Sequence, residues 1–362
     1  MNIGILTLQG ATNYGAVLQA LGLSEYLKRQ GHAVEIIDYH TPQVYGFYDY
    51  HIFSQPISPR SVASKTLRRF RNEREFKAFE TFRRQHFAFS KRISNERELA
   101  ETCVGYDAVI CGSDQVWNPR ANGGLTDSYF FGCVDGSRVK KLSYAASFGA
   151  IETAQGLEGK IADLLADYSA ISVRESEAVD FVSSLVDQPV ERVIDPSMLL
   201  TAEEYAQFER ELPTPDHFML TYMLNGNEAM TQAVAAAQAA LNLPVILLGR
   251  RMRGSTFIKD IGPGEFLTLY RRADAVITNS FHGTAFALLY GKPFLTFGNG
   301  RYNSRMETLL GIAEQESRFC TGACSAETIA ELLGAAPSPA FEALVQPERD
   351  TADRFLSRAL GL

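Results

Sequence analysis

The sequence predicts an α/β protein built from two doubly wound domains. Near the N-terminus, an apolar run at residues 3–8, a helical pattern at 16–30 and a second apolar run at 33–38 form a βαβ unit. The alternation restarts at residues 217–223, where another strand pattern precedes the Ala-rich helix 228–241. Two such halves indicate two parallel sheets facing one cleft, with ligands bound beyond the carboxyl ends of the strands.

Composition and charge narrow the class of protein. The 362 residues are 46% hydrophobic and carry a formal net charge of −7, which argues against general nucleic-acid binding. No run of about 18 apolar residues occurs, and the N-terminus lacks the charged and apolar regions of a signal peptide. An odd number of cysteines without a C-x-x-C motif predicts a reduced cytoplasmic protein with free thiols, at Cys103, Cys111, Cys133, Cys320 and Cys324.

The break between the two halves falls in the segment Asp187–Pro196, where the alternation of strands and helices stops. We therefore divide the chain into an N-terminal Rossmann-like domain (1–187), a C-terminal Rossmann-like domain (188–346) and a final helix (347–362). That helix could pack on either domain, including back on the N-terminal one.

A basic segment stands out on this acidic chain. Residues 65–92 hold ten lysines and arginines against three glutamates. The spacing predicts an amphipathic helix over 69–87, with phenylalanines on one side and arginines on the other. Two interpretations remain open: a solvated helix face, or peripheral contact with anionic lipids at the inner face of the membrane.

Two loops of the N-terminal domain carry side chains suited to a sugar. The loop 112–119 combines a carboxylate, two amides and an indole, which can hydrogen-bond hydroxyls and cover an apolar sugar face. We expect Asp114 to act as a base and Gln115, Trp117 and Asn118 to bind the acceptor; alternatively, Trp117 fills the core. The polar loop 9–15 lacks a dinucleotide fingerprint, so we expect Asn13 and Tyr14 to contact the acceptor as well.

The C-terminal domain contains a strand, a tight turn and a helix at Thr278-Asn-Ser-Phe-His-Gly-Thr284. Ser280 can cap the helix, Gly283 can let the backbone approach a ligand, and a helix N-terminus binds anions. His282 is then placed to meet an anion; the alternative is a packed histidine in a capping turn.

Three arginines follow predicted strands and could clamp phosphate or carboxylate: Arg174, Arg301 and Arg305. The alternatives are solvated surface arginines at 301 and 305, and an ion pair of Arg174 with Glu175 or Glu177. Zinc-ligand spacings and a P-loop are absent, so we expect no metal and no cofactor.

These motifs, in their order along the chain, resemble the polysaccharide pyruvyl transferase family. The matching stretches are Gly10-Ala-Thr-Asn-Tyr-Gly-Ala-Val-Leu-Gln19, Gly112-Ser-Asp-Gln-Val-Trp-Asn118, Ser143-Tyr-Ala-Ala-Ser-Phe-Gly149, Ser172-Val-Arg-Glu175, Asp195-Pro196 and Thr278-Asn-Ser-Phe-His-Gly283. The resemblance implies a GT-B-like fold with the active site between an acceptor-side N-terminal domain and a donor-side C-terminal domain.

The resemblance also implies a reaction. Pyruvate would move from phosphoenolpyruvate, a co-substrate, onto two hydroxyls of a glycan or lipid-linked sugar of capsule, exopolysaccharide or cell wall, giving a cyclic ketal and phosphate. The family's functional histidine corresponds to His282 and one donor-site arginine to Arg174; the second falls on Arg301 or Arg305. The alternatives are a GT-B nucleotide-sugar glycosyltransferase and a noncatalytic glycan-binding protein of the same fold.

Overall fold

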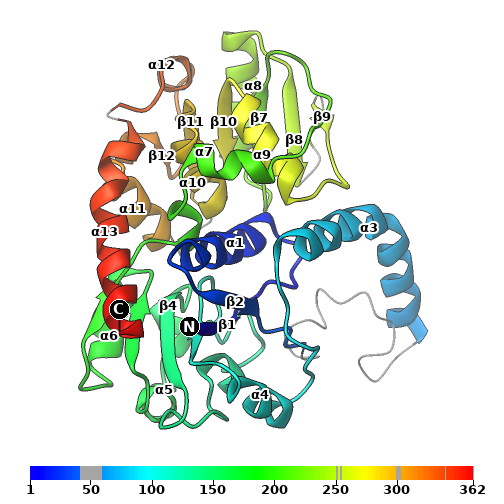
Figure 1. Ribbon diagram of the computed structural model, residues 1–362. Coiled ribbons are helices and arrows are strands. Elements are labelled where there is room, and N and C mark those ends of the chain that lie inside the picture. The colour runs from blue at the N-terminus through cyan, green and yellow to red at the C-terminus, as the bar shows by residue number, and fades with distance from the viewer. Residues whose placement is uncertain (41–58, 250–251, 253–254, 299–302, 339, 362) are drawn as a thin grey trace. The chain divides into compact units, whose positions relative to one another are not determined.

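The computed structural model of the chain describes residues 1–40, 59–249, 252, 255–298, 303–338 and 340–361, and the side chains of helix 59–86 from residue 73 onward. The chain forms two compact units, and Figure 1 labels many of their elements. The first unit comprises Met1–Leu199 and Glu348–Leu362, and the second comprises Leu200–Pro347.

The first unit is built on a six-stranded parallel sheet in the order β2-β1-β3-β4-β5-β6. Its strands are β1 (Asn2–Leu6), β2 (Ala33–Ile36), β3 (Ala108–Cys111), β4 (Lys140–Ala146), β5 (Ala170–Val173) and β6 (Val190–Arg192). Its helices are α1 (Tyr14–Arg29), α3 (Pro59–His86), α4 (Glu96–Cys103), α5 (Glu158–Leu165) and α6 (Ser176–Ser183). Helix α1 starts where Asn13 accepts a hydrogen bond from the Ala16 amide at 3.2 Å. The predicted βαβ unit is therefore confirmed.

The second unit repeats this architecture with a parallel sheet in the order β12-β11-β10-β7-β8-β9. Its strands are β7 (Met219–Met223), β8 (Val245–Gly249), β9 (Thr256–Phe257), β10 (Ala275–Thr278), β11 (Phe294–Phe297) and β12 (Phe319–Cys320). Its helices are α7 (Ala202–Tyr205), α8 (Glu228–Leu241), α9 (Pro263–Arg272), α10 (Phe281–Leu289), α11 (Ser304–Ile312) and α12 (Ala326–Gly334). Two parallel sheets flanked by helices confirm the predicted α/β class with two Rossmann-like units.

The boundary between the units lies at Leu199/Leu200, further along the chain than the predicted 187/188. The reason is β6, which adds an edge strand to the first sheet within the segment expected to be a crossing. The last helix, α13 (Phe341–Leu360), contains Pro347 at the second boundary. Beyond that proline it packs on the first unit, where Phe355 lies 6.4 Å from the Tyr144 ring and Arg192 pairs with Glu348 at 2.6 Å.

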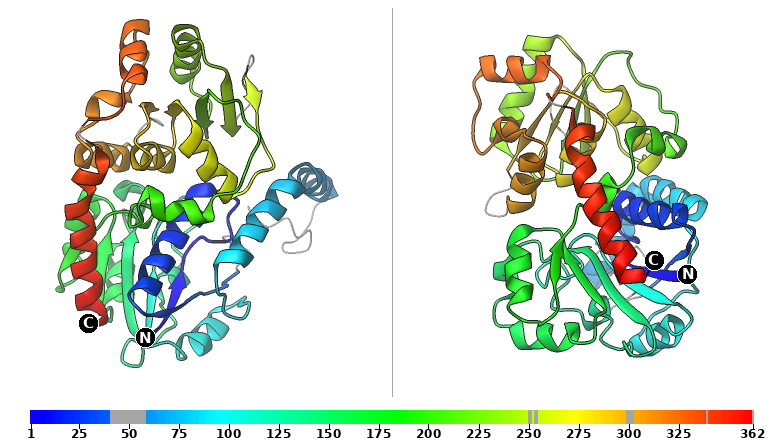
Figure 2. Two further views of the ribbon diagram at one scale, coloured as in Figure 1. Left: turned by 45° about the horizontal axis from the view of Figure 1, so that its top comes forward. Right: turned by 60° about the vertical axis from the view of Figure 1, so that its left-hand side comes forward.

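Helix α3 carries the basic segment, and Figures 1 and 2 show its N-terminal part extending away from the sheet of its own unit. Phe79 and Phe82 are buried, as the amphipathic pattern predicts, while Arg74, Lys77 and Arg84 are exposed. Arg83 is different: it is 4% exposed and donates to the carbonyl oxygen of Gln9 at 3.2 Å. The prediction that the arginines all face away from the phenylalanines is therefore wrong at Arg83. The side chains of Lys65, Arg68, Arg69 and Arg71 lie outside the described residues.

The prediction of five free thiols is wrong for one pair. Cys320 and Cys324 form a disulfide in the second unit, whereas Cys103, Cys111 and Cys133 are free. Among the described residues, no helix is both long enough and apolar enough to cross a lipid bilayer.

Candidate functional site

The loop after β3 brings Asp114 to the carboxyl edge of the first sheet. Gly112 precedes it with φ of 130°, and a side chain there would clash with the Tyr144 carbonyl. Asp114 itself has φ of 69°, a conformation that aspartate tolerates better than most residues. Its carbonyl oxygen accepts from the amides of Val116 at 2.8 Å and Ser147 at 3.1 Å. These bonds fix the backbone from which the Asp114 carboxylate, 14% exposed, projects.

Arg174 follows β5 and lies buried among three carboxylates. Its Nη1 is 2.7 Å from Asp195 Oδ2, its Nε is 3.2 Å from Glu175 Oε1, and its Nη2 is 3.9 Å from Asp114 Oδ1. Burial alone would lower the pKa of Arg174, but the three carboxylates outweigh it and raise this pKa above its ordinary value. The sequence left open an ion pair with Glu175, and that pair is present.

Serine hydroxyls complete this cluster. Asp195 accepts from the hydroxyls of Ser113 at 3.3 Å and Ser197 at 2.7 Å, and Glu175 accepts from the Ser147 hydroxyl at 2.5 Å. One guanidinium facing three carboxylates leaves the group with an excess of negative charge. This negative charge would repel an anionic donor near Arg174. Donor contact by Arg174 therefore stays a prediction that the charges of this cluster do not favour. Sequence reasoning named Glu175 only as an alternative ion-pair partner of Arg174 and assigned no role to Asp195, although both lie in stretches that carry the family resemblance.

Trp117 occupies the hydrophobic core of the first unit. It is 1% exposed and stacks on Phe130, with ring centroids 4.7 Å apart and planes at 7°. Its indole nitrogen donates to the Tyr129 carbonyl at 3.1 Å, and the Phe148 ring lies 5.4 Å away. The prediction that this ring covers a sugar is therefore wrong, because protein atoms already occupy its faces and its one donor.

Gln115 and Asn118 hold the same loop together. Asn118 Nδ2 donates to Gln115 Oε1 at 2.5 Å, and Asn118 Oδ1 accepts from the Arg120 amide at 2.9 Å. Asn118 is buried, whereas Gln115 is half-buried. Gly149, with φ of 75°, packs against both amides where a side chain would not fit. The structure thus gives Asn118 a role in shaping the loop, and acceptor contact by either amide stays a prediction.

The loop 9–13 is shaped in a similar way. Asn13 caps α1, and the Tyr14 ring is 7% exposed and lies 5.0 Å from the Phe79 ring. The buried Arg83 donates to the carbonyl oxygens of Gln9 and Ala11, at 3.2 and 3.4 Å. Sequence reasoning missed Arg83, because a basic residue on an amphipathic helix looks like part of the solvated face. Acceptor contact by Asn13 and Tyr14 is not tested by these contacts.

The turn between β10 and α10 forms the carboxyl edge of the second sheet. Ser280 caps α10 by accepting from the Gly283 amide at 3.2 Å, and the Ser280 amide donates to Thr278 Oγ1 at 3.1 Å. The predicted capping turn is confirmed. A side chain on Gly283 would clash with the Thr278 hydroxyl. Gly283 therefore permits close packing of α10 on β10, and donor binding by Ser280 and Gly283 stays a prediction.

His282 is the second residue of α10 and is 8% exposed. The His282 ring lies 5.2 Å from the Phe281 ring. The guanidinium of Arg305 lies 5.9 Å from the same Phe281 ring. Arg305 is the second residue of α11, which packs beside α10. Two helix N-termini at the ends of neighbouring strands thus carry a histidine and an arginine around one aromatic ring. Arg301 lies outside the described residues.

The described residues contain no group of three or more histidine, cysteine, aspartate or glutamate side chains that could hold a metal ion. What they offer instead is hydrogen-bonding and acid–base chemistry. The second unit presents an imidazole, a guanidinium and helix N-termini, which suit an anionic ligand. The first unit presents carboxylates, which suit hydroxyl groups.

Comparisons with known proteins agree with this architecture. A family model described as polysaccharide pyruvyl transferase matches residues 13–301. None of the curated proteins matches the chain. HepE from Anabaena, solved in complex with UDP and glucose, is 14% identical with a TM-score of 0.57, and the match covers 99% of this chain and 100% of that one.

Two UDP-GlcNAc 2-epimerases show the same likeness. The enzyme from Methanocaldococcus jannaschii is 11% identical with a TM-score of 0.52, and the match covers 96% of this chain and 99% of that one. The enzyme from Neisseria meningitidis, bound to UDP-GlcNAc, is 8% identical with a TM-score of 0.54, and the match covers 99% of this chain and 100% of that one. At such identities the likeness concerns the fold alone, which is of the GT-B type.

Proposed function

We propose that this chain, which belongs to the polysaccharide pyruvyl transferase family, moves pyruvate from phosphoenolpyruvate onto two hydroxyls of one sugar, forming a cyclic ketal and releasing phosphate. The observation that carries the proposal is that His282 and Arg305, in the first turns of α10 and α11, both lie against the Phe281 ring. Phosphoenolpyruvate carries a phosphate and a carboxylate, so its site needs cations and helix N-termini.

His282 is the general acid in this proposal. It protonates C3 of the enol, which becomes a methyl group, and C2 becomes electrophilic enough for the first sugar hydroxyl to attack. The second hydroxyl then attacks C2 and passes its proton to the imidazole of His282, which restores the acid. The C2–O bond to phosphate breaks, and phosphate leaves. Arg305 stabilises the phosphate as its charge grows, and Arg301 is the other arginine proposed for this role.

On the first unit, we assign Asp114 as the base that accepts a proton from an acceptor hydroxyl. Its carboxylate is the most exposed of the three around Arg174. Arg174 then has two proposed roles: donor binding, as the family resemblance implies, or holding the Asp114 side chain in place. The ion pairs of Arg174 support the second role.

The acceptor in this proposal is a glycan or a lipid-linked sugar, and the protein works in the cytoplasm at the inner face of the membrane. Arg74, Lys77 and Arg84 support peripheral contact, because all three are exposed on α3. Because Phe79 and Phe82 are buried, only the charged side chains would attract the lipid surface. The contact would therefore weaken as salt screens these charges.

A thermal-shift experiment separates the candidate functions. Stabilisation by phosphoenolpyruvate, without stabilisation by UDP or UDP-glucose, is the expected result. UDP is the comparison because HepE, with the same fold, was solved with UDP and glucose. Stabilisation by UDP alone would favour a nucleotide-sugar glycosyltransferase, and no shift with any of these compounds would favour a noncatalytic glycan-binding protein.

A further inference from the structure

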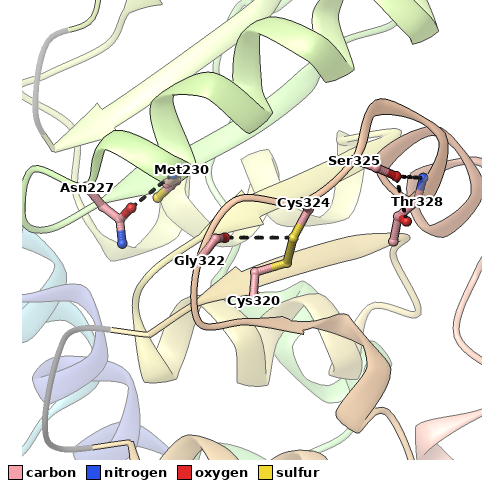
Figure 3. Close-up of a disulfide and its surroundings, with 7 residues drawn as sticks. All are labelled: Asn227, Met230, Cys320, Gly322, Cys324, Ser325 and Thr328. Atoms are coloured by element: carbon pink, nitrogen blue, oxygen red, sulfur yellow. Dashed lines mark hydrogen bonds between the residues drawn. A yellow bond between two sulfur atoms is a disulfide. The ribbon is translucent and has the colours of Figure 1, made fainter.

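The disulfide of the second unit joins a sheet edge to a helix. Figure 3 shows the bond between Cys320, the last residue of β12, and Cys324, which directly precedes Ser325, the N-cap of α12. The two Cα atoms are 6.8 Å apart. β12 is a two-residue edge strand, and the described residues pair it with Thr296 and Phe297 of β11. A strand this short gains little from pairing, so a covalent tie to α12 matters for its position.

The other cysteines are poor competitors for oxidation. Burial raises the pKa of Cys103 to about 12 and that of Cys133 to about 11, and it raises the pKa of Cys111 further. Because the thiolate is the reacting species in thiol–disulfide exchange, these three thiols react slowly. Cys324 is partly exposed, with exposed residues on both sides, so an external thiol can reach its sulfur.

A chain of contacts runs from the disulfide to the proposed donor residues. The Cys320 carbonyl oxygen accepts from the Gly298 amide at 3.1 Å, and the Gly298 carbonyl accepts from Asn227 Nδ2 at 3.2 Å. Gly298 in turn packs against the Asn303 side chain, which a methyl group on Gly298 would meet at 3.0 Å. Asn303 is the N-cap residue of α11, and Arg305 is in the first turn of that helix.

We propose that Cys320–Cys324 is a thiol–disulfide site that sets the order of the α11 N-terminus. Two equivalents of a monothiol such as glutathione, or one dithiol, reduce the S–S bond: two protein thiols form, and the reductant becomes a disulfide. The tie between β12 and α12 is then lost, Gly298 loses a fixed partner, and the first turn of α11 loosens. Arg305 lies in this turn, so its loosening lowers the affinity for phosphoenolpyruvate. This last step rests on the proposed function.

Peptide mapping and hydrogen exchange test the site without any ligand. After treatment with oxidised glutathione, a non-reducing digest should contain the Cys320–Cys324 linkage, and dithiothreitol should remove it. Amides in 303–312 should exchange at least threefold faster in the reduced protein, whereas amides of β10 should not change. The Cys324→Ser variant should match the reduced protein under oxidising conditions, and Cys133→Ser should match the wild type. Absence of the linkage, or equal exchange of 303–312 in both states, would overturn the proposal.

Titration with phosphoenolpyruvate in both redox states tests the link to function. The dissociation constant should rise about three- to tenfold on reduction, in the range seen for coupling through packed residues. An equal constant in both states would overturn the coupling while leaving the proposed function in place. No binding in either state would instead refute the donor site itself. The hydrogen-exchange experiment uses no ligand, so it would still test the disulfide site in that case.

Discussion

Replacing Arg174 with glutamine would leave three carboxylates without the cation that they share. The side chains of Arg174 and Glu175 are each 3% exposed, and that of Asp195 is 0% exposed. Water therefore cannot solvate the carboxylates that would be left without their cation. Removing one partner of a buried ion pair costs about 3–5 kcal/mol. For a unit of this size, that loss lowers the melting temperature by roughly 6–20 °C.

The pH dependence of this loss gives a second readout. In the variant, protonating a stranded carboxylate removes a buried charge that no guanidinium balances, so low pH favours the folded state of the variant. The variant then gains stability relative to the wild type as pH falls, and the difference between them should be larger at about pH 7 than at about pH 5. Calorimetry at both pH values measures it.

The matched control is Arg97→Gln, which removes an exposed arginine whose ion pair with Glu101 lies on the surface of α4. Its melting temperature should equal that of the wild type. An Arg174→Gln protein with wild-type stability that no longer responds to phosphoenolpyruvate would refute the positioning role. It would restore donor binding as the role of Arg174.

Three further predictions concern other residues. His282→Ala should lower turnover by about 10²–10⁴-fold with the melting temperature retained, as expected for loss of a general acid; near-normal turnover would contradict the assignment. Trp117→Ala should destabilise the fold by about 3–5 kcal/mol because it empties a stacked core site, and denaturant unfolding measures this; loss of acceptor use with full stability would contradict the core placement. Changing Arg74, Lys77 and Arg84 together to glutamine should reduce flotation with anionic liposomes at low salt; equal flotation of the two proteins would leave the basic surface solvated.

The fold could be predicted because strong local signals agree with the tertiary structure. Residues 3–8 and 275–278 are largely apolar, as expected for strands of a parallel sheet that is covered on both faces. The domain boundary was misplaced because β6 reads Val-Glu-Arg, a polar sequence that an edge strand accommodates and a central strand would not.

The site was predicted less completely. Ser280 was predictable as a cap because its role depends on neighbours three residues away. Trp117 was assigned to a sugar because polar residues flank it, yet its partners Phe130 and Tyr129 come from a later segment that no local pattern joins to it. Arg83 and the Cys320–Cys324 pair likewise depend on which segments the fold brings together.

A single assay can follow the transfer of pyruvate from phosphoenolpyruvate to a sugar. Purified protein would be incubated with phosphoenolpyruvate and a panel of aryl or lipid-linked glycosides, and phosphate release and product mass would be followed together. We expect one phosphate released for each pyruvyl ketal formed by the wild type, and neither product with His282→Ala. Consumption of a UDP-sugar by the wild type, with phosphoenolpyruvate left intact, would contradict this expectation.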